Sequence, residues 1–235
     1  MSEYVSTGCA EIDDLLGGGF ERGAVTQIYG PPAAGKTNLA LSAAVEVAAA
    51  GDSALYIDTE GLSADRMEQI AGARADETDE ALADLAERIV VSEALDFEDQ
   101  EVAVQDAAEL ASQIELIVLD SATGFYRLER DDGDGGEALR DVARQITHLL
   151  SLARKHDLAV AVTNQVFADP DSDGTRALGG HTLNHWSGAI VRLDRFRGGN
   201  RRATLEKHRA KAAGDTVQFR ITEAGLAGGQ DRSLD

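Results

Sequence analysis

The chain is poor in cysteine, lysine and long apolar runs. Its single cysteine, Cys9, excludes an intrachain disulfide and favours a reducing compartment. No apolar run reaches the roughly 18–20 residues that a membrane span needs, and the N-terminus has neither the basic start nor the apolar core of a secretory signal. The cysteine and the 5 histidines show no zinc-ligand spacing, and no Ser/His/Asp triad stands out. We therefore expect a cytoplasmic protein without a disulfide, a membrane segment or a zinc site.

Length and hydrophobic content point to one folded unit. The 235 residues suit a single three-layer α/β domain, and a hydrophobic fraction of 43% is too high for a disordered chain. We expect one domain over residues 1–228 and a frayed tail over 229–235.

Acidic residues dominate the charge. The chain has 42 acidic and 22 basic residues, only 4 of them lysine, and a formal net charge of −20. A strongly solvated surface in a salt-rich archaeal cytoplasm explains this charge, because salt screens self-repulsion; an acidic face for a basic partner is the alternative. Residues 192–211 depart from the pattern, with 8 basic and 2 acidic side chains. This basic band predicts contact with the phosphates of a nucleic acid or a nucleotide.

Apolar strands and amphipathic helices alternate along the first two thirds of the chain. Strands are expected at 24–29, 53–58, 89–91, 116–119 and 159–163. Helices are expected at 36–50, 64–86 with breaks, 98–112 and 137–156. A polar, glycine-rich loop follows at 168–184, and then β-like runs at 189–196, 203–207 and 216–221, separated by turn signals. This order predicts an α/β fold, a mostly parallel central sheet flanked by helices with a C-terminal antiparallel β extension.

One motif carries a specific chemistry. Gly30-Pro31-Pro32-Ala33-Ala34-Gly35-Lys36-Thr37 matches the phosphate-binding loop, or P-loop, pattern G-x-x-x-x-G-K-[ST], between an expected strand and an expected helix. The glycines let backbone N–H groups surround phosphates, and the helix N-terminus adds its positive dipole end. Lys36 reaches the β- and γ-phosphates, and Thr37 offers a hydroxyl to Mg²⁺. ATP and Mg²⁺ are therefore the expected cofactors; the alternative is a glycine-rich turn without a ligand.

Three polar residues end neighbouring strands. Asp120 follows the run 116–119 and is expected to hold Mg²⁺; a helix cap is the alternative. Glu60, after the strand 53–58, is positioned to orient and deprotonate a water molecule, unless it is only a turn residue. Gln165, after the strand 159–163, is expected to sense the γ-phosphate, unless it caps the strand end.

Together these segments resemble the RecA/RadA recombinase superfamily, and most closely its archaeal RadB group. The resemblance covers nearly the whole chain. It begins at residues 6–19 (STGCAEIDDLLGGG) and continues through the P-loop, residues 58–61 (DTEG) and residues 116–121 (LIVLDS). Residues 162–166 (VTNQV) and 178–181 (LGGH) are similar to segments of archaeal and eukaryotic recombinases.

The resemblance implies roles for individual residues. Lys36 and Thr37 would contact phosphate and Mg²⁺, Asp120 would be the second Mg²⁺ ligand, and Glu60 the catalytic glutamate. Arg66 resembles an arginine that packs on adenine. Further residues fall into two groups: expected DNA contacts, in two loops and the basic band, and expected contacts to a neighbouring subunit's ATP. The first group is Arg127, Arg130, Arg176, Arg201 and Arg202, and the second is Lys207 and Arg209. For Arg201 and Arg202, ion pairs with acidic neighbours are the alternative.

Two differences from the recombinases shape the expected function. The ATPase pattern starts at residue 6, where recombinases carry a helical DNA-binding domain first, and no Phe is followed three residues later by the Ala of their F-x-x-A tether. We expect an accessory protein with weak ATPase activity that binds DNA and assists the RadA-type recombinase of the same cell, without autonomous strand exchange. A homo-oligomer stays open. The alternatives are a KaiC-like or Sms-like regulatory ATPase that acts through protein partners and a nucleotide-dependent scaffold without useful turnover.

Overall fold

A computed structural model describes residues 3–125, 135–168, 175–177, 180–196 and 199–229. For residues 135–136, 167–168, 175–177 and 180–182 only the backbone is described. The helices are α1 (Ala10–Leu16), α2 (Lys36–Ala49), α3 (Ala64–Thr78), α4 (Leu82–Glu87), α5 (Phe97–Leu110), α7 (Gly135–His156) and α8 (Gly180–Trp186). None of these helices has both the length and the apolar character needed to cross a membrane.

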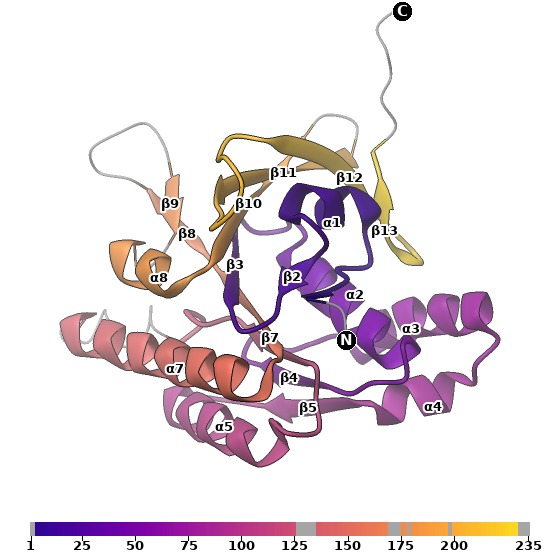
Figure 1. Cartoon of the computed structure of the whole chain (residues 1–235), viewed down its shortest axis with the longest axis horizontal. Coiled ribbons are helices and arrows are strands. Elements are labelled where there is room, and N and C mark those ends of the chain that lie inside the picture. The colour runs from indigo at the N-terminus through magenta and orange to yellow at the C-terminus, as the bar shows by residue number, and fades with distance from the viewer. Residues whose placement is uncertain (1–2, 126–134, 169–174, 178–179, 197–198, 230–235) are drawn as a thin grey trace, which may run out of the picture.

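A mixed nine-stranded sheet forms the centre of the molecule (Figure 1), with the strand order β13-β12-β11-β10-β3-β7-β6-β4-β5. Its parallel part comprises β10 (Ala189–Arg195), β3 (Val25–Tyr29), β7 (Ala159–Asn164), β6 (Leu116–Asp120), β4 (Ala54–Asp58) and β5 (Ile89–Glu93). The antiparallel extension comprises β11 (Asn200–Lys207), β12 (Thr216–Thr222) and β13 (Gly225–Gly228). Two small sheets pair β1 (Tyr4–Val5) with β2 (Phe20–Glu21) and β8 (Val166–Ala168) with β9 (Thr175–Ala177).

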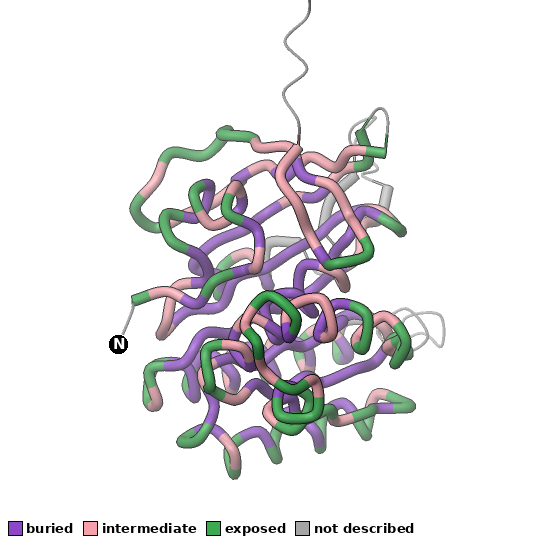
Figure 2. The backbone as a smooth tube through the Cα atoms, turned by 90° about the vertical axis from the view of Figure 1, so that its right-hand side faces the viewer, coloured by how far each residue is buried: buried purple, intermediate pink, exposed green. Residues whose placement is uncertain are grey.

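Two hydrophobic cores cover the two faces of the sheet. Alternate residues of each parallel strand point to opposite faces: Val118 belongs to the core that includes residues of α1, α2, α3 and α4, whereas Ile117 and Leu119 belong to the core that includes residues of α5 and α7. Figure 2 shows the buried segments running through the middle of the molecule and the exposed residues along its outer edge. The expected α/β fold with an antiparallel C-terminal extension is confirmed.

The helical segment expected with breaks over 64–86 is two helices, α3 and α4, because Asp79 adopts a left-handed backbone conformation (φ 57°) that ends α3. The structure corrects another expected element. The loop expected over 168–184 contains β9 and most of α8. Helix α8 has only seven residues, and its last carbonyls are bonded by Lys207, a contact that the local sequence pattern cannot reveal.

Candidate nucleotide-binding site

The P-loop lies between β3 and α2, as the sequence predicts. Gly35 precedes the first residue of α2 with a φ of 105°, a conformation that favours glycine. Gly30 is required for a different reason, since a Cβ there would collide with the Leu193 carbonyl oxygen of β10. The loop therefore brings backbone N–H groups and the N-terminus of a 14-residue helix to one place, which is the geometry of a phosphate site.

Lys36 folds back over this loop. Its side chain is buried, and its Nζ donates hydrogen bonds to the carbonyl oxygens of Gly30 (3.1 Å) and Pro31 (3.3 Å). Burial lowers the pKa of Lys36, and the nearby carboxylates of Glu60 and Asp120 oppose this change. The ammonium group thus lies within the loop, with two acidic residues close by.

Asp120 ends β6 and is almost completely buried. Tyr56 Oη donates a hydrogen bond to its Oδ2 (2.6 Å), Thr163 Oγ1 donates to its Oδ1, and the Thr37 side chain is a third hydrogen-bond partner. Burial raises the pKa of Asp120, whereas the three hydrogen bonds from hydroxyl groups lower it. The structure therefore brings together the two residues that the sequence predicts as Mg²⁺ ligands, Thr37 and Asp120.

Glu60 lies in the turn after β4, at the same edge of the sheet. Its Oε1 accepts hydrogen bonds from Ser121 Oγ and from Gln165 Nε2, both at 2.9 Å. The turn itself is held by Asp58, whose carboxylate accepts the backbone N–H groups of residues 60–62. Because Asp58 and Asp120 are register partners in neighbouring parallel strands, the Glu60 turn and the end of β6 are adjacent.

Arg66 lies near the first turn of α2. Its Nε donates to Asn38 Oδ1 (2.8 Å), and its two amino groups donate to the carbonyl oxygens of Thr222 (2.7 Å) and Glu223 (3.0 Å). The guanidinium group therefore connects α3 to α2 and to the turn after β12. This position, one residue along α2 from Thr37, agrees with a role beside a nucleotide, which stays a prediction.

The two arginines of β11 lie on opposite faces of the strand. Arg201 donates to the carbonyl oxygen of Ala33 in the P-loop (3.2 Å), whereas the guanidinium carbon of Arg202 lies 4.3 Å from the centre of the Phe196 ring. Ion pairs with acidic neighbours, the alternative considered for both, are not among the contacts of these two side chains within the described residues.

The other expected cationic residues are more dispersed. Lys207 Nζ donates to the carbonyl oxygens of Asn184 (2.7 Å) and Ser187 (2.8 Å), at the end of α8. Arg209 lies 3.8 Å from Glu21. Arg176 is in β9, where only the backbone is described. Arg127 and Arg130 lie outside the described residues.

Sequence reasoning missed the residues that hold the acidic groups in place, namely Tyr56, Thr163 and Ser121. Tyr56 lies inside a buried strand and looks like an ordinary core residue. Thr163 and Ser121 flank the strand ends that carry Gln165 and Asp120, so polar residues beside a predicted site are the signal that could have found them.

Comparison with known proteins places this geometry in a family. The Rad51 family model matches residues 3–228. The DNA repair and recombination protein RadB of Halobacterium salinarum strain R1 is 62% identical over 226 residues, which cover 95% of this chain and 94% of that protein. RadB of Methanoculleus marisnigri is 45% identical over 229 residues, covering 96% and 98%. A crystal structure of the RadB recombinase superimposes with a TM-score of 0.82 at 35% identity, covering 96% of this chain and 100% of that one.

The chain therefore belongs to the Rad51 family of recombination proteins, and its relatives within that family include archaeal RadB proteins. The family and the fold predicted from the sequence are confirmed, and so is a role in DNA repair and recombination. Proteins of this family bind nucleotides, typically with Mg²⁺, and membership in a recombination family implies interaction with DNA.

Proposed function

We propose that this protein binds MgATP at the P-loop, hydrolyses it slowly, and acts as an accessory to the main recombinase in DNA repair and recombination. One observation carries the proposal: the P-loop, the Thr37–Asp120 pair and the Glu60–Gln165 pair meet at one edge of the sheet. These three parts are what phosphoryl transfer requires, namely a phosphate cradle, a metal site and a group that orients water.

The residues present suit a nucleotide and its metal ion. Carbonyl oxygens now accept the hydrogen bonds of Lys36, and phosphate oxygens are stronger acceptors because they carry charge. The hydroxyl of Thr37 and the carboxylate of Asp120 are oxygen donors of the kind that Mg²⁺ prefers. Held by these two residues, a Mg²⁺ ion would supply positive charge that stabilises phosphoryl transfer.

Glu60 is the residue best placed to accept a proton from the attacking water. Glu60 is exposed, and Ser121 and Gln165 hold one of its carboxylate oxygens by hydrogen bonds. That arrangement leaves Oε2 for water and connects the carboxylate to the end of β7 through Gln165. A change at the γ-phosphate could thereby reach β8, which begins directly after Gln165.

DNA and a RadA-type recombinase are the proposed partners. The basic band at 192–211 supports DNA binding, since its 8 basic side chains outnumber its 2 acidic ones in an otherwise acidic chain. Autonomous strand exchange is not part of the proposal, because the sequence has no F-x-x-A tether for a continuous filament. A salt-rich archaeal cytoplasm is the proposed location, supported by the net charge of −20 and by the identity to Halobacterium salinarum RadB.

Glu60→Gln tests the hydrolytic part of this proposal. The amide cannot accept the proton but leaves the phosphate cradle intact, so we expect hydrolysis to fall by roughly 10²-fold or more while the affinity for MgATP stays within about twofold. Phosphate release, measured in high salt with and without DNA, gives the rate, and calorimetry gives the affinity. Hydrolysis at the parent rate would reduce Glu60 to a turn residue.

A further inference from the structure

The antiparallel extension of the sheet packs directly against the P-loop. The Leu193 carbonyl of β10 lies against Gly30, and the side chains of Phe219 and Ile221 of β12 lie against Gly35, with Ile221 Cδ1 3.1 Å from where a Cβ would be. Both glycines of the phosphate-binding motif therefore contact strands that follow them by more than 150 residues. The extension forms one wall of the loop.

Arg201 of β11 completes that wall at the middle of the P-loop. Its Nε donates to Ala33 O at 3.2 Å, and its Nη1 donates to Gly199 O at 2.7 Å and Asn200 O at 3.3 Å. One planar guanidinium group thus bonds the loop and the β10–β11 turn at once. A planar cation with several fixed donors is suited to this task, which a lysine ammonium would perform less well.

Ala33 is the residue that most needs such support. It is exposed, and its backbone adopts a left-handed conformation with a φ of 60°, although it is not a glycine. Such a conformation is unfavourable for an alanine and persists only when surrounding contacts fix it. The hydrogen bond from Arg201 reaches the carbonyl of this residue, so it acts on the strained point of the loop.

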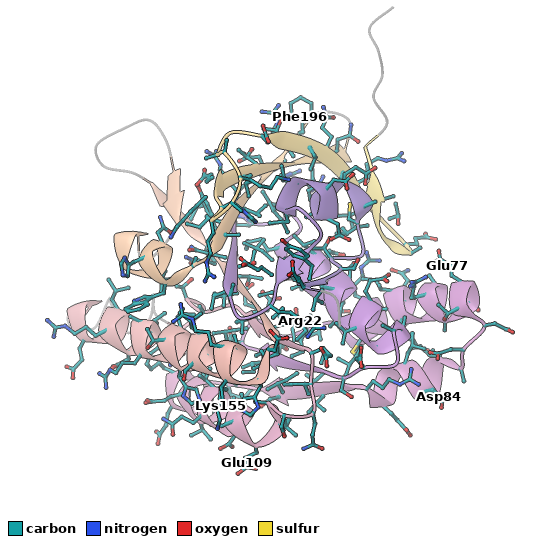
Figure 3. All side chains as sticks on the ribbon, in the orientation of Figure 1. Arg22, Glu77, Asp84, Glu109, Lys155 and Phe196 are labelled. Carbon is teal, nitrogen blue, oxygen red and sulfur yellow. The ribbon has the colours of Figure 1, made fainter. Side chains whose placement is uncertain are left out.

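The neighbouring arginine has a different environment. Arg202 points to the other face of β11 and stacks on Phe196, which is 37% exposed; Figure 3 shows Phe196 at the outer end of the extension. Arg195 is the register partner of Arg201 across the β10–β11 pair; it is exposed, and no hydrogen bond or ion pair to another described residue is found for it. Among the three, Arg201 alone bonds the P-loop.

We propose that Arg201 is a positioning residue of the nucleotide site, which holds the P-loop in its phosphate-binding conformation through the Ala33 carbonyl. This inference rests on the proposed function, since it presupposes that the loop binds ATP. The basic band alone would suggest a contact with DNA for Arg201. The structure instead supports a role in the P-loop of the same subunit, through the hydrogen bond to the Ala33 carbonyl.

Calorimetric titration of MgATP into the full-length protein tests this role. Arg201→Gln should bind MgATP about five- to tenfold more weakly, as expected for the loss of one solvent-exposed hydrogen bond. Arg201→Lys should recover only part of the affinity, since it restores the charge without the planar donors. Arg195→Gln is the matched control: it removes the same charge beside Arg201 and should leave the affinity within about twofold.

Two further readouts separate positioning from a general structural role. The KM for ATP should rise in Arg201→Gln while kcat changes less than about twofold, and the midpoint of thermal unfolding without nucleotide should stay near that of Arg195→Gln. Parent-like affinity in Arg201→Gln, or an equal loss in Arg195→Gln, overturns the inference. If the parent itself does not bind MgATP, or if Lys36→Ala binds it equally well, the proposed function fails instead.

Discussion

At the residue scale, the site depends on hydroxyl groups that hold one buried carboxylate. Asp120 is bonded by Tyr56 from β4, Thr163 from β7 and Thr37 from α2. Since a buried carboxylate is costly unless it is well bonded, these three donors keep Asp120 at the place where a metal ion can be bound. Each donor comes from a different element, so the position of Asp120 depends on the packing of β4, β7 and α2 around β6.

Cys9 gives a pH-dependent prediction at the same scale. Its thiol is buried, and burial raises its pKa from the ordinary value of 9.0 to about 11. The unfolded chain therefore loses this proton near pH 9, whereas the folded chain keeps it until about pH 11. Consequently the free energy of unfolding should fall as pH rises through this window, by up to about 1.4 kcal/mol per pH unit.

The control for this effect is Cys9→Ala, which removes the titrating group. Burial also raises the pKa values of Tyr29 and Tyr56, so both proteins lose stability at high pH, and the difference between their slopes isolates Cys9. Urea unfolding at several pH values between 8.5 and 11 measures the slopes. Parallel slopes in the two proteins would show that Cys9 does not titrate as its burial requires.

At the scale of elements, two buried amides connect α5, α7 and the segment after β6. Gln100 Nε2 donates to Gln145 Oε1 (2.6 Å) and to Ala122 O (3.4 Å), and both glutamines are buried. Ala122 follows Ser121, which bonds Glu60. The two helices are therefore joined to the segment that contacts Glu60, the proposed catalytic residue.

Replacing one amide should cost more than replacing both. Gln100→Leu leaves the buried amide of Gln145 without this partner, and we expect a loss of about 1–3 kcal/mol in the free energy of unfolding. Gln100→Leu combined with Gln145→Leu removes both polar groups and should recover part of that loss. Urea unfolding of the parent, both single variants and the double variant measures the coupling. Strictly additive losses would contradict a cooperating pair.

The sequence predicts an element of the fold well where the local apolar and glycine pattern determines it. The P-loop, β6 with Asp120 and the antiparallel extension all follow from apolar runs and glycine positions. Helix α8 does not, because Lys207 bonds its end from a strand more than 20 residues away. Likewise the sequence pattern predicts Asp120 as a site residue but not its hydrogen-bond donor Tyr56. It predicts Arg201 as a phosphate-binding cation but not its hydrogen bond to Ala33.

At the scale of the whole molecule, the net charge restricts where DNA can bind. The net charge of −20 repels DNA in general, so a binding site needs a local excess of cations. Arg202 of the extension points away from the P-loop face and stacks on Phe196, an exposed aromatic ring. Arginine and aromatic side chains of this kind suit the backbone and the bases of single-stranded DNA.

Arg202→Gln should therefore weaken DNA binding about equally for all sequences and reduce the slope of log K against log salt by about one. Fluorescence anisotropy with single-stranded DNA at several salt concentrations measures both quantities. Arg195→Gln, at the last residue of β10, reports what the loss of a nearby charge does. An unchanged affinity and slope in Arg202→Gln would remove this arginine from the DNA site.

The central claim is that the P-loop of this Rad51-family protein binds MgATP, and calorimetric titration of the parent and of Lys36→Ala tests it most directly. Lys36 Nζ donates hydrogen bonds to carbonyl oxygens of the loop, so removing the ammonium group should spare the fold, as circular dichroism would verify. We expect saturable binding by the parent and at least a tenfold loss in Lys36→Ala, since a charge-assisted contact to phosphate is worth roughly 1.5–3 kcal/mol. Equal affinity in the two proteins, or no binding by the folded parent, would contradict the account.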